Sequence, residues 1–241
     1  MVILLGCIVW TSWRFWRILP FPHWGKWLFV TLYILAFLVI FPHFMLGNKM
    51  PMSLATATYE IGTSWMIFFL YALLIFVVLS LGRLFHLVPA GFLKDSWVGT
   101  LTVLGAITMI LVYGNIHYHH KYRECIDLQT EKPLERPLTI VLASDLHAGY
   151  HNRKAELSRW VKLFNDENPD LVLFGGDIID GAIRPVKEGH YSEVFRGIDA
   201  PVYSCLGNHE YISGEQGSEE FYHDAGITLL RDSSTEVSGI R

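Results

Sequence analysis

Two side chains that can bind a metal ion stand close together after a short apolar segment. Asp145 and His147 follow the run Thr139–Ala143 and are separated by one residue. In an extended backbone, residues two positions apart point to the same side. A carboxylate oxygen and an imidazole nitrogen aimed at one point suit a divalent ion such as Mn²⁺, Zn²⁺ or Fe²⁺. Taken alone, such a pair at a strand end is more often a turn that contains a hydrogen-bonded histidine.

Two later segments place the same kinds of side chain after an apolar run. Asp177 follows Leu171–Phe174 and a Gly-Gly pair, and Asn208 and His209 follow Pro201–Cys205. Each has an ordinary alternative, because Gly-Gly-Asp is compatible with a tight turn and Asn-His-Glu with the start of a helix. The carboxyl ends of strands in an open α/β sheet, however, meet at one edge, where ligands bind. The three segments together therefore predict a metal site.

The elements that must position these groups are expected to alternate between strand and helix. Strands are predicted over Leu138–Ser144, Leu171–Phe174, Pro201–Cys205, Ile227–Leu230 and Thr235–Ile240. Helices are predicted over Arg153–Asn165, with Asn152 as its N-cap, and over Tyr191–Arg196 and Glu215–Ala225. This alternation with short loops indicates an α/β domain, and the apolar second strand indicates a parallel sheet.

The site motifs also resemble those of one family in their order and spacing. The calcineurin-like metallophosphoesterases share the patterns Asp145-Leu-His147, Gly176-Asp177 and Gly207-Asn208-His209-Glu210, and the resemblance covers residues 138–241. It implies a β-sheet sandwich flanked by helices, with a centre of two divalent metal ions (Mn²⁺, Zn²⁺ or Fe²⁺). By this resemblance Asp145 and His147 hold the first ion. Asp177 bridges both ions, and Asn208 binds the second through its side-chain oxygen. His209 contacts the scissile phosphate and stabilises or protonates the leaving oxygen.

One part of the family pattern has no counterpart in this sequence. The family continues with a further histidine and a Gly-His-x-His motif that supply the remaining ligands, and no residue after His223 matches them. We therefore expect a C-terminally incomplete domain in a chain that is a fragment. Such a chain would bind the second metal poorly and be inactive as written.

The first half of the chain differs sharply from the second in charge. Residues 1–120 contain six basic and two acidic residues, whereas residues 138–241 contain nine and seventeen. Long apolar runs predict about four transmembrane helices, over residues 2–19, 27–46, 61–81 and 96–118. The first span requires Arg14 and Arg17 to reach the membrane interface. The expected architecture is a multi-span α-helical membrane anchor (1–120), a linker (121–137) and an α/β metallophosphoesterase domain (138–241).

These features predict a membrane-anchored phosphoesterase that hydrolyses phosphomono- or phosphodiesters through a dinuclear metal centre. A lipid-linked or envelope-linked phosphate is a candidate substrate because the domain is tethered near a bilayer. The acidic second half argues against a nucleic-acid partner, which needs a basic surface. The helical region resembles that of the membrane-bound bacterial members of this family, which implies a location in a bacterial inner membrane. The basic residues near short loops favour a domain outside the cytoplasm. The alternatives are a non-catalytic membrane protein with a degenerate metal-binding domain and a channel or transporter, which the scarcity of charge in the spans disfavours.

Overall fold

The chain forms two compact units that meet between Ile126 and Asp127. The computed structural model describes residues 2–131, 134 and 136–237. The division falls inside the predicted linker, and each unit has its own hydrophobic core. The exact limits given above for the membrane region, linker and domain stay a prediction.

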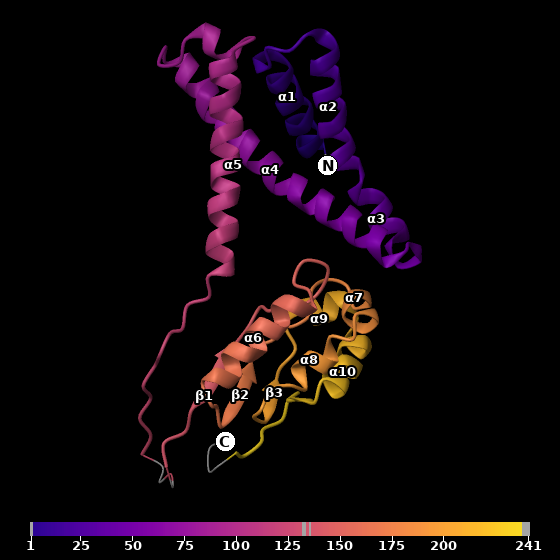
Figure 1. Ribbon diagram of the computed structural model, residues 1–241, viewed down its shortest axis with the longest axis vertical. Helices are drawn as coiled ribbons and strands as arrows, with labels where there is room; N and C mark the ends of the chain where they lie inside the picture. The colour runs from indigo at the N-terminus through magenta and orange to yellow at the C-terminus, as the bar shows by residue number, and fades with distance from the viewer. Residues whose placement is uncertain (1, 132–133, 135, 238–241) are drawn as a thin grey trace. The chain divides into compact units, whose positions relative to one another are not determined.

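The first unit is built from helices (Figure 1). They are α1 (Val2–Ile18), α2 (His23–Leu38), α3 (Ile40–Leu46), α4 (Met52–Leu84) and α5 (Trp97–His119), with the 3₁₀ turns η1 (Gly47–Lys49) and η2 (Ala90–Leu93). Among the described residues, three stretches are long and apolar enough to cross a membrane: His23–Lys49, Met52–Leu84 and Trp97–His119. The 17-residue helix α1 packs against α2 and α4. Its role as a fourth span stays a prediction.

The end of α1 and the start of α2 are joined to the segment before α5. Lys26 forms an ion pair with Asp95, and the pKa of Asp95 is lowered mainly by this hydrogen bond. The backbone N–H of Asp95 donates to the carbonyl of Arg17 (2.8 Å), and that of Ser96 to the carbonyl of Ile18 (2.9 Å). These contacts hold the two loops at the same end of the helical unit.

The second unit contains a four-stranded parallel sheet in the order β1-β2-β3-β4 (Figure 1). The strands are β1 (Ile140–Ala143), β2 (Leu171–Phe174), β3 (Val202–Ser204) and β4 (Ile227–Leu229). The helices are α6 (Lys154–Asp166), α7 (Arg184–Glu188), α8 (Ser192–Phe195), α9 (Asn208–Ser213) and α10 (Glu215–Asp224). The expected α/β domain with a parallel sheet and flanking helices is thus confirmed.

The core of this unit lies on one face of the sheet. Alternate strand residues such as Val172 and Val202 are buried together with Trp160 of α6, Phe195 of α8 and Phe221 of α10. Residues of opposite parity point to the other face, where Leu142 of β1 is 73% exposed. The part of the chain that the structure describes contains this one sheet, so a second layer of the expected sandwich is not among the described residues.

Local details differ from the sequence-based expectations in three places. Helix α7 was not expected, whereas α9 begins at Asn208, where the start of a helix was the alternative interpretation. The N-cap prediction for Asn152 is wrong, because α6 begins after Arg153 and has no side-chain cap. Asn152 instead donates from Nδ2 to the carbonyl of Leu146 (2.9 Å), which braces the loop after β1. Of the strand expected over Thr235–Ile240, Thr235 and Glu236 are not in a strand, and residues 238–240 lie outside the described residues.

Candidate metal centre

The loops that follow β1 and β2 run side by side at the carboxyl edge of the sheet. The N–H of Asp145 donates to the carbonyl of Gly176 (3.2 Å), and the N–H of His147 to the carbonyl of Asp177 (3.0 Å). A third bond joins Ala148 N–H to the Ile178 carbonyl (2.7 Å). The in-register parallel strands deliver the two loops to one edge, and these bonds continue the pairing into the loops.

Three of the predicted ligands have a left-handed backbone. The φ angles of Asp145, His147 and Asp177 are 57°, 46° and 53°. This region costs a residue with a side chain roughly 1–2 kcal/mol, so it persists only where the surroundings hold it in place. Left-handed residues tend to cluster at functional sites. The interloop hydrogen bonds provide the restraint at this edge.

The same three residues bring their side chains together. One ligand atom each from Asp145, His147 and Asp177 lie within 4.8 Å of one another. The Nε2 atom of His147 is 3.7 Å from Oδ1 of Asp145. Two carboxylate oxygens and an imidazole nitrogen are a donor set that Mn²⁺, Fe²⁺ and Zn²⁺ accept. The residues present therefore fit a divalent metal ion.

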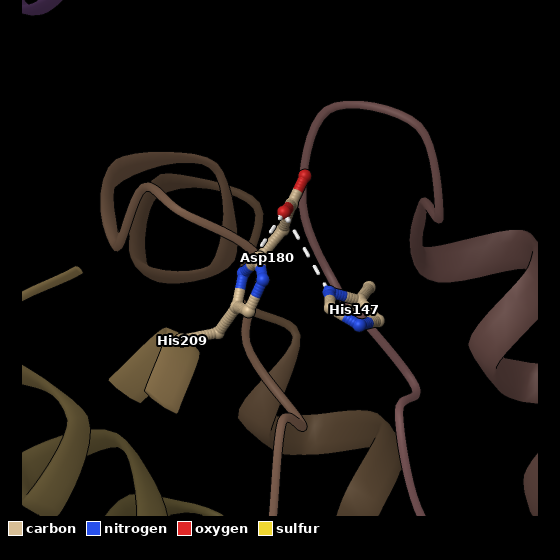
Figure 2. Close-up of side chains that lie close together, drawn as sticks. All are labelled: His147, Asp180 and His209. Atoms are coloured by element: carbon tan, nitrogen blue, oxygen red, sulfur yellow. Dashed lines mark ion pairs between the residues drawn. The ribbon is translucent and has the colours of Figure 1, made fainter. Parts of the chain in front are cut away.

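A second group adjoins the first through His147 (Figure 2). Asp180 lies between two imidazoles, with its Oδ1 3.7 Å from Nδ1 of His147 and 3.4 Å from Nδ1 of His209. The two rings are nearly perpendicular, with centroids 4.3 Å apart. The Nδ1 atom of His209 is buried and has no hydrogen-bond partner among the described residues. An acidic side chain, two imidazoles and an unsatisfied nitrogen thus line one side of the predicted centre.

Asp180 is the site residue that sequence reasoning missed. It stands three residues after Asp177 in the same loop, in the pattern Asp-Ile-Ile-Asp. The available signal was a second carboxylate three residues after the predicted ligand Asp177. Spacing within a loop, however, does not fix the direction in which a side chain points. The contact with His209 spans 29 positions and is visible only in the fold.

Helix α9 brings the third predicted segment to the same edge. Asn208 is its first residue, and the N–H of His209 donates to Oδ1 of Asp177 (2.8 Å). The structure therefore places His209 beside both Asp177 and Asp180. Asn208 is its sequence neighbour, and its role as a ligand to a second ion stays a prediction.

Glycines allow the loops after β2 and β3 to touch at the backbone. A Cβ on Gly176, whose φ is 88°, would lie 2.6 Å from the nitrogen of Gly207. A Cβ on Gly207 would collide with the carboxylate of Asp177. Such distances are too short for a side chain, so both positions require glycine. The close approach sets Asp177 directly against the start of α9.

Comparison with known proteins identifies the class that this site defines. Residues 138–237 match the calcineurin-like phosphoesterase family. The second unit is therefore a calcineurin-like metallophosphoesterase domain, preceded in this chain by long apolar helices. No solved structure matches the chain significantly.

Relatives occur in bacteria and in animals. An uncharacterized metallophosphoesterase of Aquifex aeolicus is 27% identical over 52% of this chain and 49% of its own length. A zebrafish (Danio rerio) transmembrane protein with a metallophosphoesterase domain is 27% identical over 60% of this chain and 34% of its own length. The phosphodiesterase YaeI of Escherichia coli is 28% identical over 42% of this chain and 39% of its own length. The chain thus spans half or less of these relatives.

Proposed function

We propose that this protein is a membrane-anchored, metal-dependent phosphoesterase that hydrolyses a phosphomono- or phosphodiester. The observation that carries the proposal is the convergence of Asp145, His147 and Asp177 within ligand distance at the carboxyl edge of the sheet. The adjacent pair of Asp180 and His209 adds a group suited to proton transfer. A purely structural metal site would not need that pair.

In this proposal Asp145 and His147 would hold one divalent ion, and Asp177 and Asn208 would provide oxygen ligands for a second. When bound, such ions supply positive charge to the phosphate oxygens and lower the pKa of water. The proposal is that two divalent ions bind together and that they are Mn²⁺, Zn²⁺ or Fe²⁺. The carboxylates would hold the ions, and the N–H of His209 donates to Oδ1 of Asp177 (2.8 Å) and so helps to fix this carboxylate.

His209 is proposed to act on the leaving group. The Asp180 carboxylate lies 3.4 Å from Nδ1 of His209, so that it faces this side of the ring. To donate a proton to the departing oxygen, the ring must carry protons on both nitrogens: the Nδ1 proton stays directed at Asp180, and the Nε2 proton is the one transferred. Asp180 itself is a positioning residue in this scheme.

The membrane setting suggests both location and substrate class. We place the protein in a bacterial inner membrane, with the phosphoesterase domain outside the cytoplasm. Arg17, Lys26 and Lys94 lie in or beside the two loops that the Lys26–Asp95 pair holds at one end of the helical unit. Basic residues mark the cytoplasmic side of a membrane protein, and α5 leaves from the opposite end. A lipid-linked phosphate would be within reach of a domain tethered there.

The test is Mn²⁺-dependent hydrolysis of bis-p-nitrophenyl phosphate and p-nitrophenyl phosphate in detergent. The 241-residue chain is assayed beside its His209→Ala variant. We expect about 10²–10⁴-fold slower turnover on loss of a general acid, with metal content unchanged. His223→Ala is the matched control, because its side chain is 91% exposed on α10. Metal binding without hydrolysis of either ester by the unmutated chain would favour the non-catalytic binding domain instead.

A further inference from the structure

Glu210 is a site carboxylate to which the proposed chemistry assigns no part. It follows His209 in α9, and it is fully buried, with 0% of its surface exposed. An ionised carboxylate is costly to bury unless hydrogen bonds replace its water. Its partners therefore indicate what it does.

Three backbone N–H groups from two different loops donate to this one carboxylate. Oε2 accepts from Asp177 (2.9 Å) and from Gly207 (2.8 Å), and Oε1 accepts from Ile179 (3.0 Å). Asp177 and Ile179 belong to the loop after β2, whereas Gly207 precedes α9. Hydrogen bonds to an ionised acceptor are about twice as strong as neutral ones. Glu210 thus joins the two loops at the place where their backbones touch.

These bonds act on a residue that is proposed to be a metal ligand. Glu210 fixes the N–H of Asp177, whose φ of 53° is unfavourable for a residue with a side chain. The next residue back, His209, fixes Oδ1 of Asp177 through its own N–H. Asp177 is therefore held at its backbone and at its carboxylate by adjacent residues of α9.

We propose that Glu210 is a positioning residue, which holds the loop of Asp177 in its left-handed conformation and so preforms the metal site before an ion binds. This inference rests on the proposed assignment of Asp177 as a metal ligand. An amide at position 210 offers one accepting oxygen and one donating nitrogen. The nitrogen would face N–H donors, so glutamine cannot replace the carboxylate although it has the same shape.

The experiment measures Mn²⁺ binding by electron paramagnetic resonance on the full chain in detergent. We expect Glu210→Gln to weaken Mn²⁺ binding by about 10–100-fold, the usual effect of losing a group that orients a ligand, and to change the line shape of the bound ion. Glu210→Asp keeps the charge and should recover part of the affinity. Glu220→Gln is the control, because Glu220 is exposed and pairs with Lys187. Unchanged affinity in folded Glu210→Gln would overturn the proposal.

A measurement on the unmutated protein covers the case in which the variants fail to fold. Hydrogen–deuterium exchange without metal should show slow exchange in peptides that contain the amides of Asp177, Ile179 and Gly207. Rapid exchange there would mean that the loops order only around the ion, and the proposal would be wrong. Neither readout depends on turnover. An inactive protein that binds Mn²⁺ through a Glu210-dependent site would refute the proposed function and leave this inference standing.

Discussion

His147 faces two carboxylates, one through each ring nitrogen. Its Nε2 is 3.7 Å from Asp145 and its Nδ1 is 3.7 Å from Asp180. Asp180 in turn reaches His209, so one carboxylate influences both the proposed ligand and the proposed acid. Asp177 has a different environment, with backbone donors around it and its carboxylate directed at the ligand group. Substitution of Asp177 and of Asp180, which lie in the same loop, should therefore impair different properties of the protein.

Asp180→Asn should slow turnover by about 10–100-fold, the usual cost of removing a group that orients a ligand, while most of the bound metal is retained. Asp177→Asn should instead remove metal from the protein. The check is metal content by mass spectrometry beside kcat for bis-p-nitrophenyl phosphate. If Asp180→Asn loses metal as fully as Asp177→Asn, Asp180 is a ligand and its positioning role is wrong.

At the scale of elements, the site depends on two loops that meet where no side chain fits. Gly207 lies against Asp177, and Gly176 lies against Gly207. The strands alone cannot produce this contact, since they only bring the loops to the same edge. Helix α9 follows at once, and its Glu210 closes the contact with three hydrogen bonds.

Gly207→Ala should lower both the melting temperature and Mn²⁺ affinity, because its methyl group would displace the Asp177 carboxylate. Overpacking of this kind costs typically about 1–3 kcal/mol. Gly217→Ala in α10 is the matched control, since its Cβ would meet Ile183 at an ordinary 3.4 Å and alanine favours a helix. Calorimetry and Mn²⁺ titration check both variants. Equal melting temperatures and equal Mn²⁺ affinities for the two variants would show that the contact between Gly207 and Asp177 is not tight.

A second element-scale prediction concerns the start of the sheet. Asp170, just before β2, pairs with Arg136 and accepts from the N–H of Thr139, and these hydrogen bonds lower its pKa from the ordinary 3.8. A lowered folded-state pKa contributes stability above pH 3.8 that is lost as the pH falls through the folded value. The Asp170→Asn variant should therefore have a lower melting temperature than the unmutated protein at pH 7, and this difference in melting temperature should shrink as the pH falls below 3.8. A constant difference from pH 7 to pH 3 would exclude the ion pair as its cause.

At the scale of the whole molecule, the chain combines a helical unit with a metallophosphoesterase domain. If the three long apolar stretches each cross the membrane, the loops around Lys26 and Lys94 lie on one side of it and the end of α5 on the other. This arrangement is the same whether or not α1 crosses the membrane, because α1 determines only on which side of the membrane the N-terminus lies. Orientation and span number can therefore be tested independently.

Single cysteines in intact cells provide that test, after the free Cys7, Cys125 and Cys205 are changed to serine. A membrane-impermeant maleimide should label Lys121→Cys and not Lys94→Cys, while lysed cells should label both. Val2→Cys should behave like Lys121→Cys if α1 crosses the membrane. The reverse pattern at positions 94 and 121 would place the phosphoesterase domain in the cytoplasm.

The sequence by itself determined the features that depend on neighbouring residues. Apolar runs of membrane length, strands that end in metal-binding side chains and the parallel α/β alternation all follow from local patterns, and the structure contains them. The residues Asp145, His147 and Asp177 could be singled out because each directly follows a strand, and parallel strands share an edge. Their ligand roles remain predictions.

Only the tertiary structure decided the features that join distant segments. Asp180 meets His209, Glu210 binds the amide of Asp177, and Asn152 braces Leu146 instead of capping α6. A local propensity is a weak preference of a fraction of a kcal/mol to about 1 kcal/mol, and a tertiary hydrogen bond of similar strength can override it. The left-handed conformations of the ligand residues likewise arise from contacts between loops. The spacing of residues along the chain identifies the candidate site residues, whereas tertiary contacts determine the direction in which each side chain points.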